Sequence, residues 1–230
     1  MRPTRLRRTP TALVALLTML LAFGLAACGS DDEKSSSGDS GGADKTEKVE
    51  KAFLTGMVHH HESAISMSAV AEVKGKDPFI TKLAGEISAT QEREMDQMDA
   101  IYKRLFKAAL KPDFGAHDGL GLSAEEAGMT HSEDTNENLR AAKPFDRAFV
   151  DEMVPHHEGA IKMADVVLKS TKDDELRKLA EGIISTQERE VKEMNAFRTK
   201  EYGGPVPAGA SHGGEKKKPG GKEHGAGHSG

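Results

Sequence analysis

The chain has 230 residues, a modest net charge of −5 with mixed signs, and only 4% aromatic residues, none of them tryptophan. No basic face with interleaved aromatic side chains occurs, so a nucleic acid is not an expected partner. Cys28 is the sole cysteine, which excludes disulfide bonds within the chain and thiolate metal sites in the folded part.

The N-terminal segment has the three parts of a bacterial lipoprotein signal. Residues 1–10 are basic, an apolar run follows, and the sequence LAAC ends at Cys28. The run is short for a membrane span, and small residues before a cysteine are typical of a cleavage site. We expect residues 1–27 to be a signal peptide and Cys28 to carry a lipid anchor at the extracytoplasmic face of the cell membrane. An ordinary signal peptide with an incidental cysteine is the alternative.

Both ends of the remaining chain lack the apolar residues that a core requires. Residues 28–48 are rich in Gly, Ser and Asp and are predicted to form a flexible tether. Residues 203–230 form a Gly/Lys/His tail that we expect to be disordered. The part between them, 49–202, has the size of one compact domain.

An internal duplication organises this domain. A shift of 96 positions aligns MVHHHESAIS, which starts at Met57, with MVPHHEGAIK, which starts at Met153. The alignment continues without a gap through two TQERE segments. A match of this length indicates a duplication, with repeats at about 49–109 and 144–202 and a connection at 110–143.

Each repeat is predicted to be a helical hairpin. In the first, a helix from about residue 46 ends near Gly75, and Asp77-Pro78 begins a second helix. The second repeat starts after Pro144 and turns at 171–174. No segment alternates with a period of two. We therefore predict an all-α protein, a ferritin-like antiparallel four-helix bundle built from two duplicated helical hairpins.

Histidines and methionines share one face of the first helix of each repeat. At 100° per residue, Met57, His60, His61 and Met67 fall within a sector of about 120°, whereas His59 points toward solvent. Two adjacent inward histidines, flanked by methionines and repeated at the same register, are hard to explain by core packing alone and favour metal binding. The candidate metal ligands are Met57, His60, His61, Met67, Met153, His156, His157 and Met163.

The second helix of each repeat places polar residues where leucines would suit a purely structural core. Buried amides and carboxylates are unfavourable unless a histidine cluster or a cation pairs with them. These residues are therefore candidates for additional ligands or for partners of the ligands: Gln91, Glu94, Met98, Gln187, Glu190 and Met194.

The residue three positions before each histidine pair decides the choice of metal. Bundles that hold two iron ions place glutamate there, but this chain has Met57 and Met153. A thioether in place of a carboxylate favours Cu(I), and imidazole also suits Cu(II). Copper is therefore the predicted ion.

Other parts of the chain carry fewer signals. Ser123 to Glu126 is a candidate capping box for a short helix in the connection. Further histidines and one methionine are expected to gather metal only loosely, and for the tail a simply solvated end is the alternative: His117, Met129 and His131 in the connection, and His212, His224 and His228 in the tail.

The paired MVPHHEGAIKMA and MVHHHESAISMS, each followed by TQERE, resemble the ferritin-like domain of unknown function 305 family. Its usual motif is Met-Ile-Pro-His-His-Gln-x-Ala-Ile-x-Met-Ala. The resemblance covers nearly all of residues 50–202 and implies an exported four-helix domain, in a family that includes a periplasmic copper-binding protein. His59 replaces the motif's proline in the first repeat, and Glu158 replaces its glutamine in the second.

The combined prediction is a membrane-anchored, extracytoplasmic copper-binding protein that sequesters or transfers copper without catalysis, with a copper-transfer protein as a partner. Two alternatives stay open. One is a ferritin-like dimetal oxidase, because Glu94 and Glu190 remain as carboxylates. The other is a structural or partner-binding bundle whose histidines respond to pH.

Overall fold

The computed structural model describes residues 40–130 and 133–207. The predictions for the signal peptide, for Cys28, for His131 and for the histidines of the tail lie outside these ranges.

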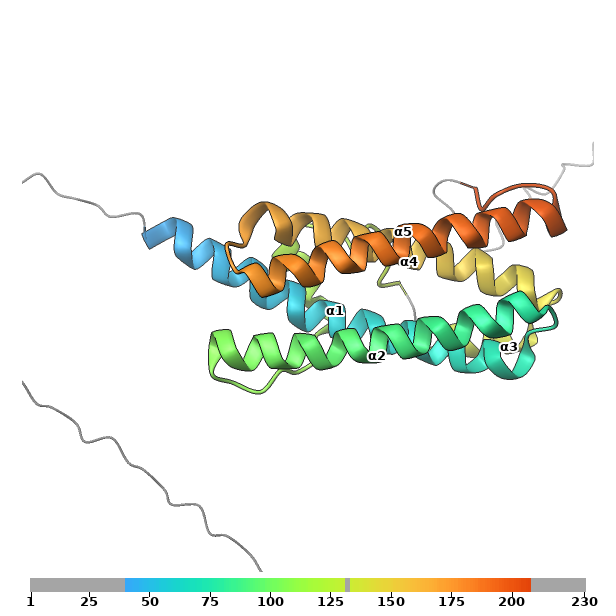
Figure 1. The fold of residues 1–230 in the computed structure, drawn as a ribbon, viewed down its shortest axis with the longest axis horizontal. Coiled ribbons are helices and arrows are strands. Elements are labelled where there is room, and N and C mark those ends of the chain that lie inside the picture. The colour runs from blue at the N-terminus through green and yellow to red at the C-terminus, as the bar shows by residue number, and fades with distance from the viewer. Residues whose placement is uncertain (1–39, 131–132, 208–230) are drawn as a thin grey trace, which may run out of the picture. The chain divides into compact units, whose positions relative to one another are not determined.

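The described residues form helices and connecting turns without any strand, which confirms the all-α prediction. Four long helices build the bundle, and a 3-10 helix and a short α-helix lie in the connection (Figure 1). In chain order they are α1 (Ser40–Lys74), α2 (Pro78–Phe106), η1 (Phe114–Leu120), α3 (Glu133–Ala141), α4 (Phe145–Ser170) and α5 (Asp174–Tyr202).

Capping residues set most of the helix ends. The carboxylate of Asp77 accepts a hydrogen bond from the Phe79 amide at 2.8 Å at the start of α2. Asp173 accepts one from the Leu176 amide at 2.9 Å at the start of α5. A glycine in the left-handed region, Gly203 with φ 81°, ends α5. α1 begins at Ser40, so it extends into the segment predicted as tether, and the side chains of 42–48 are mostly exposed.

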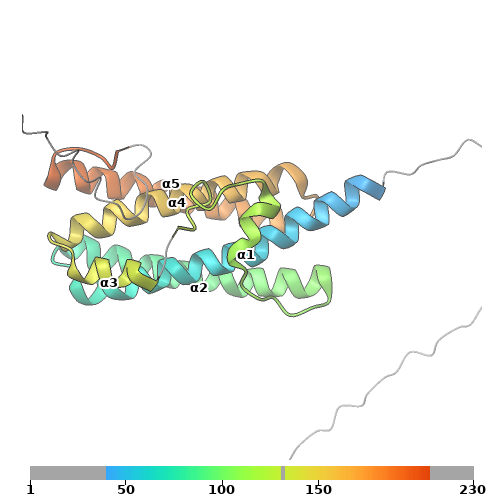
Figure 2. The same ribbon diagram turned by 180° about the vertical axis from the view of Figure 1, so that it is seen from behind.

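The two repeats pack as antiparallel hairpins, with α1 against α2 and α4 against α5. α1 also packs along α4, whereas α2 and α5 meet over a smaller region. The connection runs over the α1–α4 face, where η1 lies against α1 and α3 contacts both helices (Figure 2). This face of the bundle is therefore covered, and the α2–α5 face is the more open one.

The core consists of two apolar clusters. One contains Phe53, Leu54 and Ile101 from the first repeat with Val167 and Leu176 from the second. The other combines residues such as Ile80 and Ile87 with Phe149 and Val150. Along every long helix the two clusters are separated by one stretch of buried polar residues.

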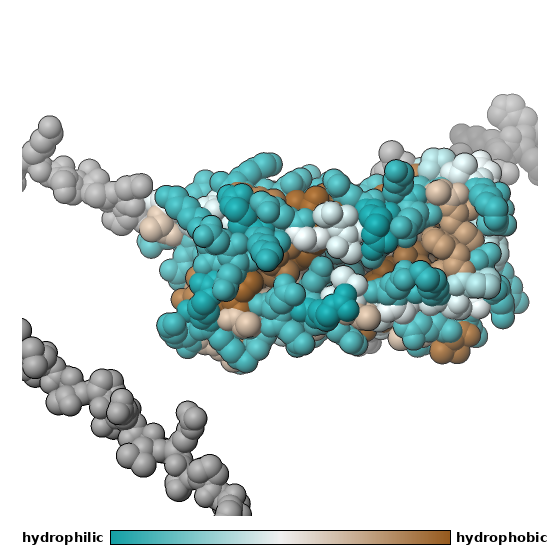
Figure 3. All heavy atoms as spheres, viewed as in Figure 1, coloured by the Kyte–Doolittle hydropathy of each residue, from teal (hydrophilic) through white to brown (hydrophobic). Residues whose placement is uncertain are grey.

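The surface of the bundle is largely polar, with apolar patches visible between α5 and α2 (Figure 3). Within the described residues, no helix combines the length and the apolar character needed to cross a membrane.

Candidate metal site

Eight buried polar side chains form a layer across the middle of the bundle. Each long helix contributes two of them, and all are at most 9% exposed. We call this set the polar layer: His60 and His61 on α1, Gln91 and Glu94 on α2, His156 and His157 on α4, and Gln187 and Glu190 on α5. The sequence predicted all eight as site residues, and the structure brings them together at one level of the bundle.

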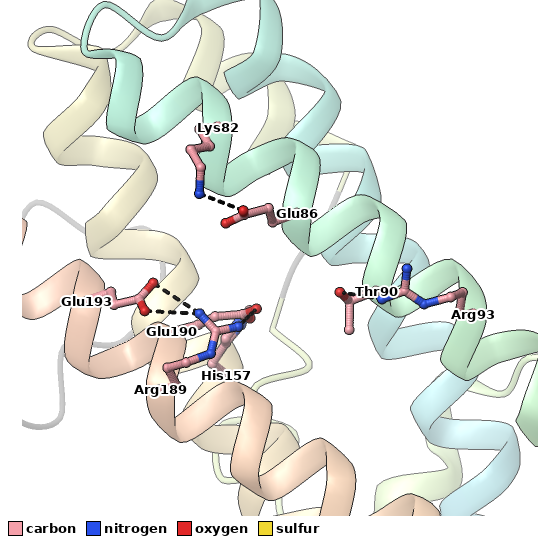
Figure 4. Close-up of polar contacts among 8 residues, drawn as sticks. All are labelled: Lys82, Glu86, Thr90, Arg93, His157, Arg189, Glu190 and Glu193. Atoms are coloured by element: carbon pink, nitrogen blue, oxygen red, sulfur yellow. Dashed lines mark hydrogen bonds and ion pairs between the residues drawn. The ribbon is translucent and has the colours of Figure 1, made fainter.

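The inner histidine of each repeat is held by a carboxylate of the same repeat. Nε2 of His61 lies 2.8 Å from Oε2 of Glu94, and Nε2 of His157 lies 2.8 Å from Oε2 of Glu190. Figure 4 shows Glu190 between His157 and the arginine beside it. An ionised carboxylate only accepts hydrogen bonds, so each Nε2 carries the proton that it donates.

This pairing leaves Nδ1 of both inner imidazoles as the nitrogen with the free lone pair. Nδ1 of His61 and of His157 is buried and has no hydrogen-bond partner among the described residues. A carboxylate that fixes the tautomer and orientation of a histidine in this way is the usual arrangement behind a metal-bound imidazole.

The outer histidines of the two repeats meet each other. The ring centroids of His60 and His156 are 3.6 Å apart, whereas within each repeat the adjacent rings are 6.3 Å apart. His60 and His156 also line a small cavity beneath the connection. The predicted single ligand face is therefore divided into an outer pair under the connection and two inner histidines directed at α2 and α5.

The six predicted methionines lie above and below the polar layer. All are at most 1% exposed, so each packs in the core. One apolar cluster contains Met57, Met98 and Met163, and the other contains Met67, Met153 and Met194. Each cluster thus combines two methionines of one repeat with one of the other.

A turn of the connection is seated on the outer histidines. Ser123 and Glu126 form the predicted capping box, with the Glu126 amide donating to Ser123 Oγ at 3.2 Å and the Ser123 amide to Glu126 Oε2 at 2.9 Å. They begin a single helical turn that ends at Gly128, with φ 65°. A Cβ on Gly159 of α4 would lie 2.3 Å from the Gly128 amide nitrogen, so the turn touches the backbone of α4.

The two inner pairs differ in their access to solvent. Oε1 of Glu190 is 3.2 Å from Arg189, and the Glu190 side chain is only 2% exposed. The equivalent Arg93 instead donates to Thr90 at 3.1 Å (Figure 4). Glu94 lines a groove of about 550 Å³ between α2 and α5. The first repeat's inner histidine therefore lies closer to an open surface.

Two residues of the outer cavity lie differently from what the sequence predicted. His59 was expected to face solvent, but it is half-buried, lines the cavity and packs its ring against Phe114 at 5.4 Å. Met129 of the connection was expected to gather metal only loosely, but it is buried and lines the same cavity. His117 is also buried, but its Nδ1 lies 3.0 Å from the Leu122 carbonyl. Only the path of the connection, which periodicity does not reveal, could have placed Met129.

Within 40–130 and 133–207, no group of three or more His, Cys, Asp or Glu side chains is arranged to hold a metal ion. The candidate ligands that remain near the histidines are thioethers and the amides of Gln91 and Gln187, whose side-chain atoms lack hydrogen-bond partners in the same part of the chain.

Known proteins resemble this chain over most of the described region. A family model described as Domain of unknown function (DUF305) matches residues 50–198. The solved structure of CopM in the Cu(I)-bound form is 31% identical, covers 67% of this chain and 98% of that chain, and has a TM-score of 0.56. CopM has also been solved in Ag-bound and Cu(II)-bound forms.

Two further relatives have either a lower sequence identity or a shorter matched region than CopM. A DUF305 fragment from Deinococcus radiodurans is 26% identical, covers 66% of this chain and 96% of that chain, and has a TM-score of 0.57. An uncharacterized protein of Acanthamoeba polyphaga mimivirus is 39% identical over 52 residues, which are 23% of this chain and 34% of that relative. The similarity thus spans about a third of the viral protein's length.

Proposed function

The chain belongs to the family of the Domain of unknown function (DUF305), and from this membership we propose that it binds copper through the histidines and methionines of its two repeats. The family is the one that the duplicated motif resembled, so that prediction is confirmed. CopM, which is similar over 98% of its length, was solved with Cu(I) and with Cu(II) bound.

The observation that carries the proposal is the pair of buried imidazoles at the same register of the two repeats. Each donates Nε2–H to a glutamate and keeps a buried Nδ1 without a hydrogen-bond partner among the described residues. A buried polar atom without a partner costs about 1–3 kcal/mol. A bound cation would remove that cost at both positions.

The neighbouring donors favour a soft ion. Methionine four positions before an inner histidine lies on the same helix face, as Met57 does for His61 and Met153 for His157. Imidazole and thioether groups suit Cu(I), and imidazole also suits Cu(II). We propose Met57, His60, His61, Met67, Met153, His156, His157 and Met163 as the ligand set, with Cu(I) as the favoured ion.

We further propose that the protein sequesters or hands on copper outside the cytoplasm and does not catalyse a reaction. The sequence LAAC before the folded part supports a lipid anchor on Cys28. The wild-type protein should then incorporate a labelled fatty acid, and the Cys28→Ala variant should not. Equal labelling of the two proteins, or labelling of neither, would contradict the anchor.

Titration of the full-length chain with Cu(I), Cu(II), Zn(II) and Fe(II) tests the metal proposal. We expect copper binding that is lost when His60, His61, His156 and His157 are replaced by alanine, while circular dichroism still shows a helical protein. No copper binding by the wild-type chain would overturn the proposal. Consumption of Fe(II) with oxygen would instead support the dimetal oxidase that Glu94 and Glu190 allow.

The role of the glutamates has a matched control on the same helix. Glu94→Gln removes the charged acceptor of the His61 Nε2–H, so copper affinity should fall on the order of 10- to 100-fold. Glu92→Gln makes the same chemical change at an exposed position and should leave the affinity unchanged. Equal effects of the two substitutions would mean that the His–Glu contact does not support the ligand.

A further inference from the structure

A small cavity lies where α1, α4 and the connection meet. Its volume is about 10 Å³, and its walls are formed by His59, His60, Ser63, Gly128, Met129 and His156. A cavity of about this size accommodates a single water-sized particle. It therefore suits one small ion and excludes an organic ligand.

Met129 reaches this cavity from the connection, outside both repeats. Its side chain is 3% exposed, and its amide donates to the Ala124 carbonyl at 2.8 Å. The Gly128 amide donates to the Glu125 carbonyl at 3.1 Å. These two bonds and the positive φ of Gly128 form the glycine-ended helical turn that fixes the backbone immediately before the Met129 side chain.

Contacts with both outer histidines hold this turn in place. A Cβ on Gly128 would lie 2.8 Å from the His156 carbonyl oxygen and 3.2 Å from Nε2 of His60. On the opposite side, Gly159 leaves room for the Ala127–Gly128 peptide, since a Cβ there would lie 2.3 Å from the Ala127 carbonyl carbon. The connection is thus fitted closely against the helix that carries His156, and Met129 is positioned by backbone packing.

Nitrogen and sulfur predominate among the donors around the cavity. Its walls contain imidazoles, one thioether and one hydroxyl, but no carboxylate. Hard divalent cations prefer several oxygen ligands, and burial of a charge becomes more costly as the charge grows. A monovalent soft ion bound by imidazole and thioether therefore fits this cavity better than a hard divalent ion.

We propose that the thioether of Met129 binds the copper ion together with the imidazoles of His60 and His156. The inference rests on the proposed copper-binding function and adds a ligand that comes from neither motif. It makes the connection a part of the metal site, so an ion at the outer pair is enclosed from the side of the connection.

The test must separate ligation from packing, because Met129 also belongs to an apolar cluster. In the full-length chain, Met129→Leu retains the size and apolar character of the side chain and removes only the sulfur. Met95→Leu is the matched control, since Met95 is a half-buried methionine on α2 that packs against the same cluster but does not line the cavity. Competition with a chromophoric Cu(I) chelator measures affinity, and thermal unfolding of the metal-free variants measures packing.

We expect Met129→Leu to weaken Cu(I) binding at least about tenfold, because substitution of a residue that only hydrogen-bonds a metal ligand already lowers metal affinity by about that factor. Met95→Leu should leave the Cu(I) affinity unchanged. In the wild-type protein with ¹³C-labelled methionine methyl groups, Ag(I) should shift the Met129 resonance and leave that of Met95 in place.

Different results overturn the two proposals. One result would overturn only this inference: the wild-type chain binds Cu(I), the double substitution His60→Ala with His156→Ala weakens binding, and Met129→Leu does not. The Met129 methyl resonance of the wild-type protein would then also stay fixed when Ag(I) is added. Met129 would in that case be a packing residue. If the wild-type chain does not bind Cu(I), the proposed function fails and the inference fails with it.

Discussion

At the scale of single residues, the polar layer places eight polar side chains where a four-helix core usually has apolar ones. Hydrogen bonds between helices hold two of its pairs, His61 with Glu94 and His157 with Glu190. The amides of Gln91 and Gln187 are buried without partners in the described part of the chain. A layer of this kind weakens the metal-free core, so its repetition in both halves indicates a use other than packing.

Gly159 is a point of close contact between the connection and α4, and it provides a stability prediction. Gly159→Ala would force a Cβ against the backbone of Ala127 and Gly128. Since backbone cannot move aside as a side-chain end can, the free energy of unfolding should fall by about 1–3 kcal/mol. Chemical denaturation of the metal-free protein measures this change.

Gly182 on α5 is the matched control for that substitution. A Cβ there would meet nothing within 4 Å. Gly182→Ala should therefore raise the free energy of unfolding by about 0.5–1 kcal/mol, because glycine is unfavourable inside a helix. If both substitutions stabilise the protein, the connection is not seated on α4 as described.

The sequence allowed the histidines, glutamines and glutamates of the polar layer to be predicted because they recur at helical spacing in both repeats. Helical spacing also placed the inner and outer histidines on one face, although they contact different elements. His59 was expected to face solvent, and Met129 was expected to gather metal only loosely. Met129 lies in the unrepeated connection, and the half-buried His59 packs against Phe114 of η1, which also lies in the connection.

At the scale of elements, the N-terminus of α5 joins the two repeats at one end of the bundle. Nη2 of Arg104, at the end of α2, lies 2.7 Å from Oδ1 of Asp173, and its Nε lies 2.9 Å from Oε2 of Glu175. Asp173 is also the N-cap of α5. One aspartate thus caps a helix and pairs with the other repeat.

This arrangement predicts a pH-dependent contribution to stability. The hydrogen bond from Arg104 holds the pKa of the Asp173 carboxyl below its usual value, and the Leu176 amide adds to the effect. Because the pKa is lowered by folding, the stabilisation is present above the unfolded pKa of about 3.9 and is lost as the pH falls through the folded value.

Asp173→Asn keeps an N-cap side chain but removes the charge. The wild-type protein should therefore be more stable than this variant at pH 7, by about 0.2–1 kcal/mol, and the difference should decrease below about pH 4. Denaturation at pH 7 and at pH 3 provides the comparison. In an Arg104→Gln background the difference at pH 7 should shrink, and an unchanged difference would rule out the pairing as its cause.

The sequence predicted the helix ends that a capping residue marks, such as the start of α2 at Asp77. It did not predict where α1 begins. Among residues 42–48 no apolar side chain is buried, and burial begins at Val49, so this part of α1 continues a helix whose packing begins later. The capping box at Ser123 formed, but Gly128 ends its helix after one turn. η1 and α3 carry no periodic apolar pattern long enough to predict them.

At the scale of the whole bundle, neither repeat has a core of its own. Each apolar cluster draws on both repeats, and the methionine sets are shared in the same way. The outer histidines also come from different repeats and meet at a centroid distance of 3.6 Å. Folding and the candidate metal site therefore depend on the same pairing of hairpins.

This dependence predicts the behaviour of a divided protein. The isolated hairpin 40–109 would expose the apolar face that α4 and α5 cover, and a chain of about 70 residues rarely builds a sufficient core alone. We expect it to show no cooperative thermal unfolding as a monomer, measured by circular dichroism and sedimentation. Mixing it with residues 110–207 should restore helicity and cooperative unfolding, because the second fragment supplies the other half of both clusters.

The duplication sharpens this prediction. The two repeats present related faces, so the hairpin 40–109 could fold by pairing with a second copy of itself. Such a dimer would agree with the prediction, because each core would again be shared between two hairpins. A monomeric hairpin 40–109 that unfolds cooperatively near the melting temperature of the whole protein would contradict it. In that case the repeats would be independent units, and the histidines that meet between them would no longer require both halves to fold together.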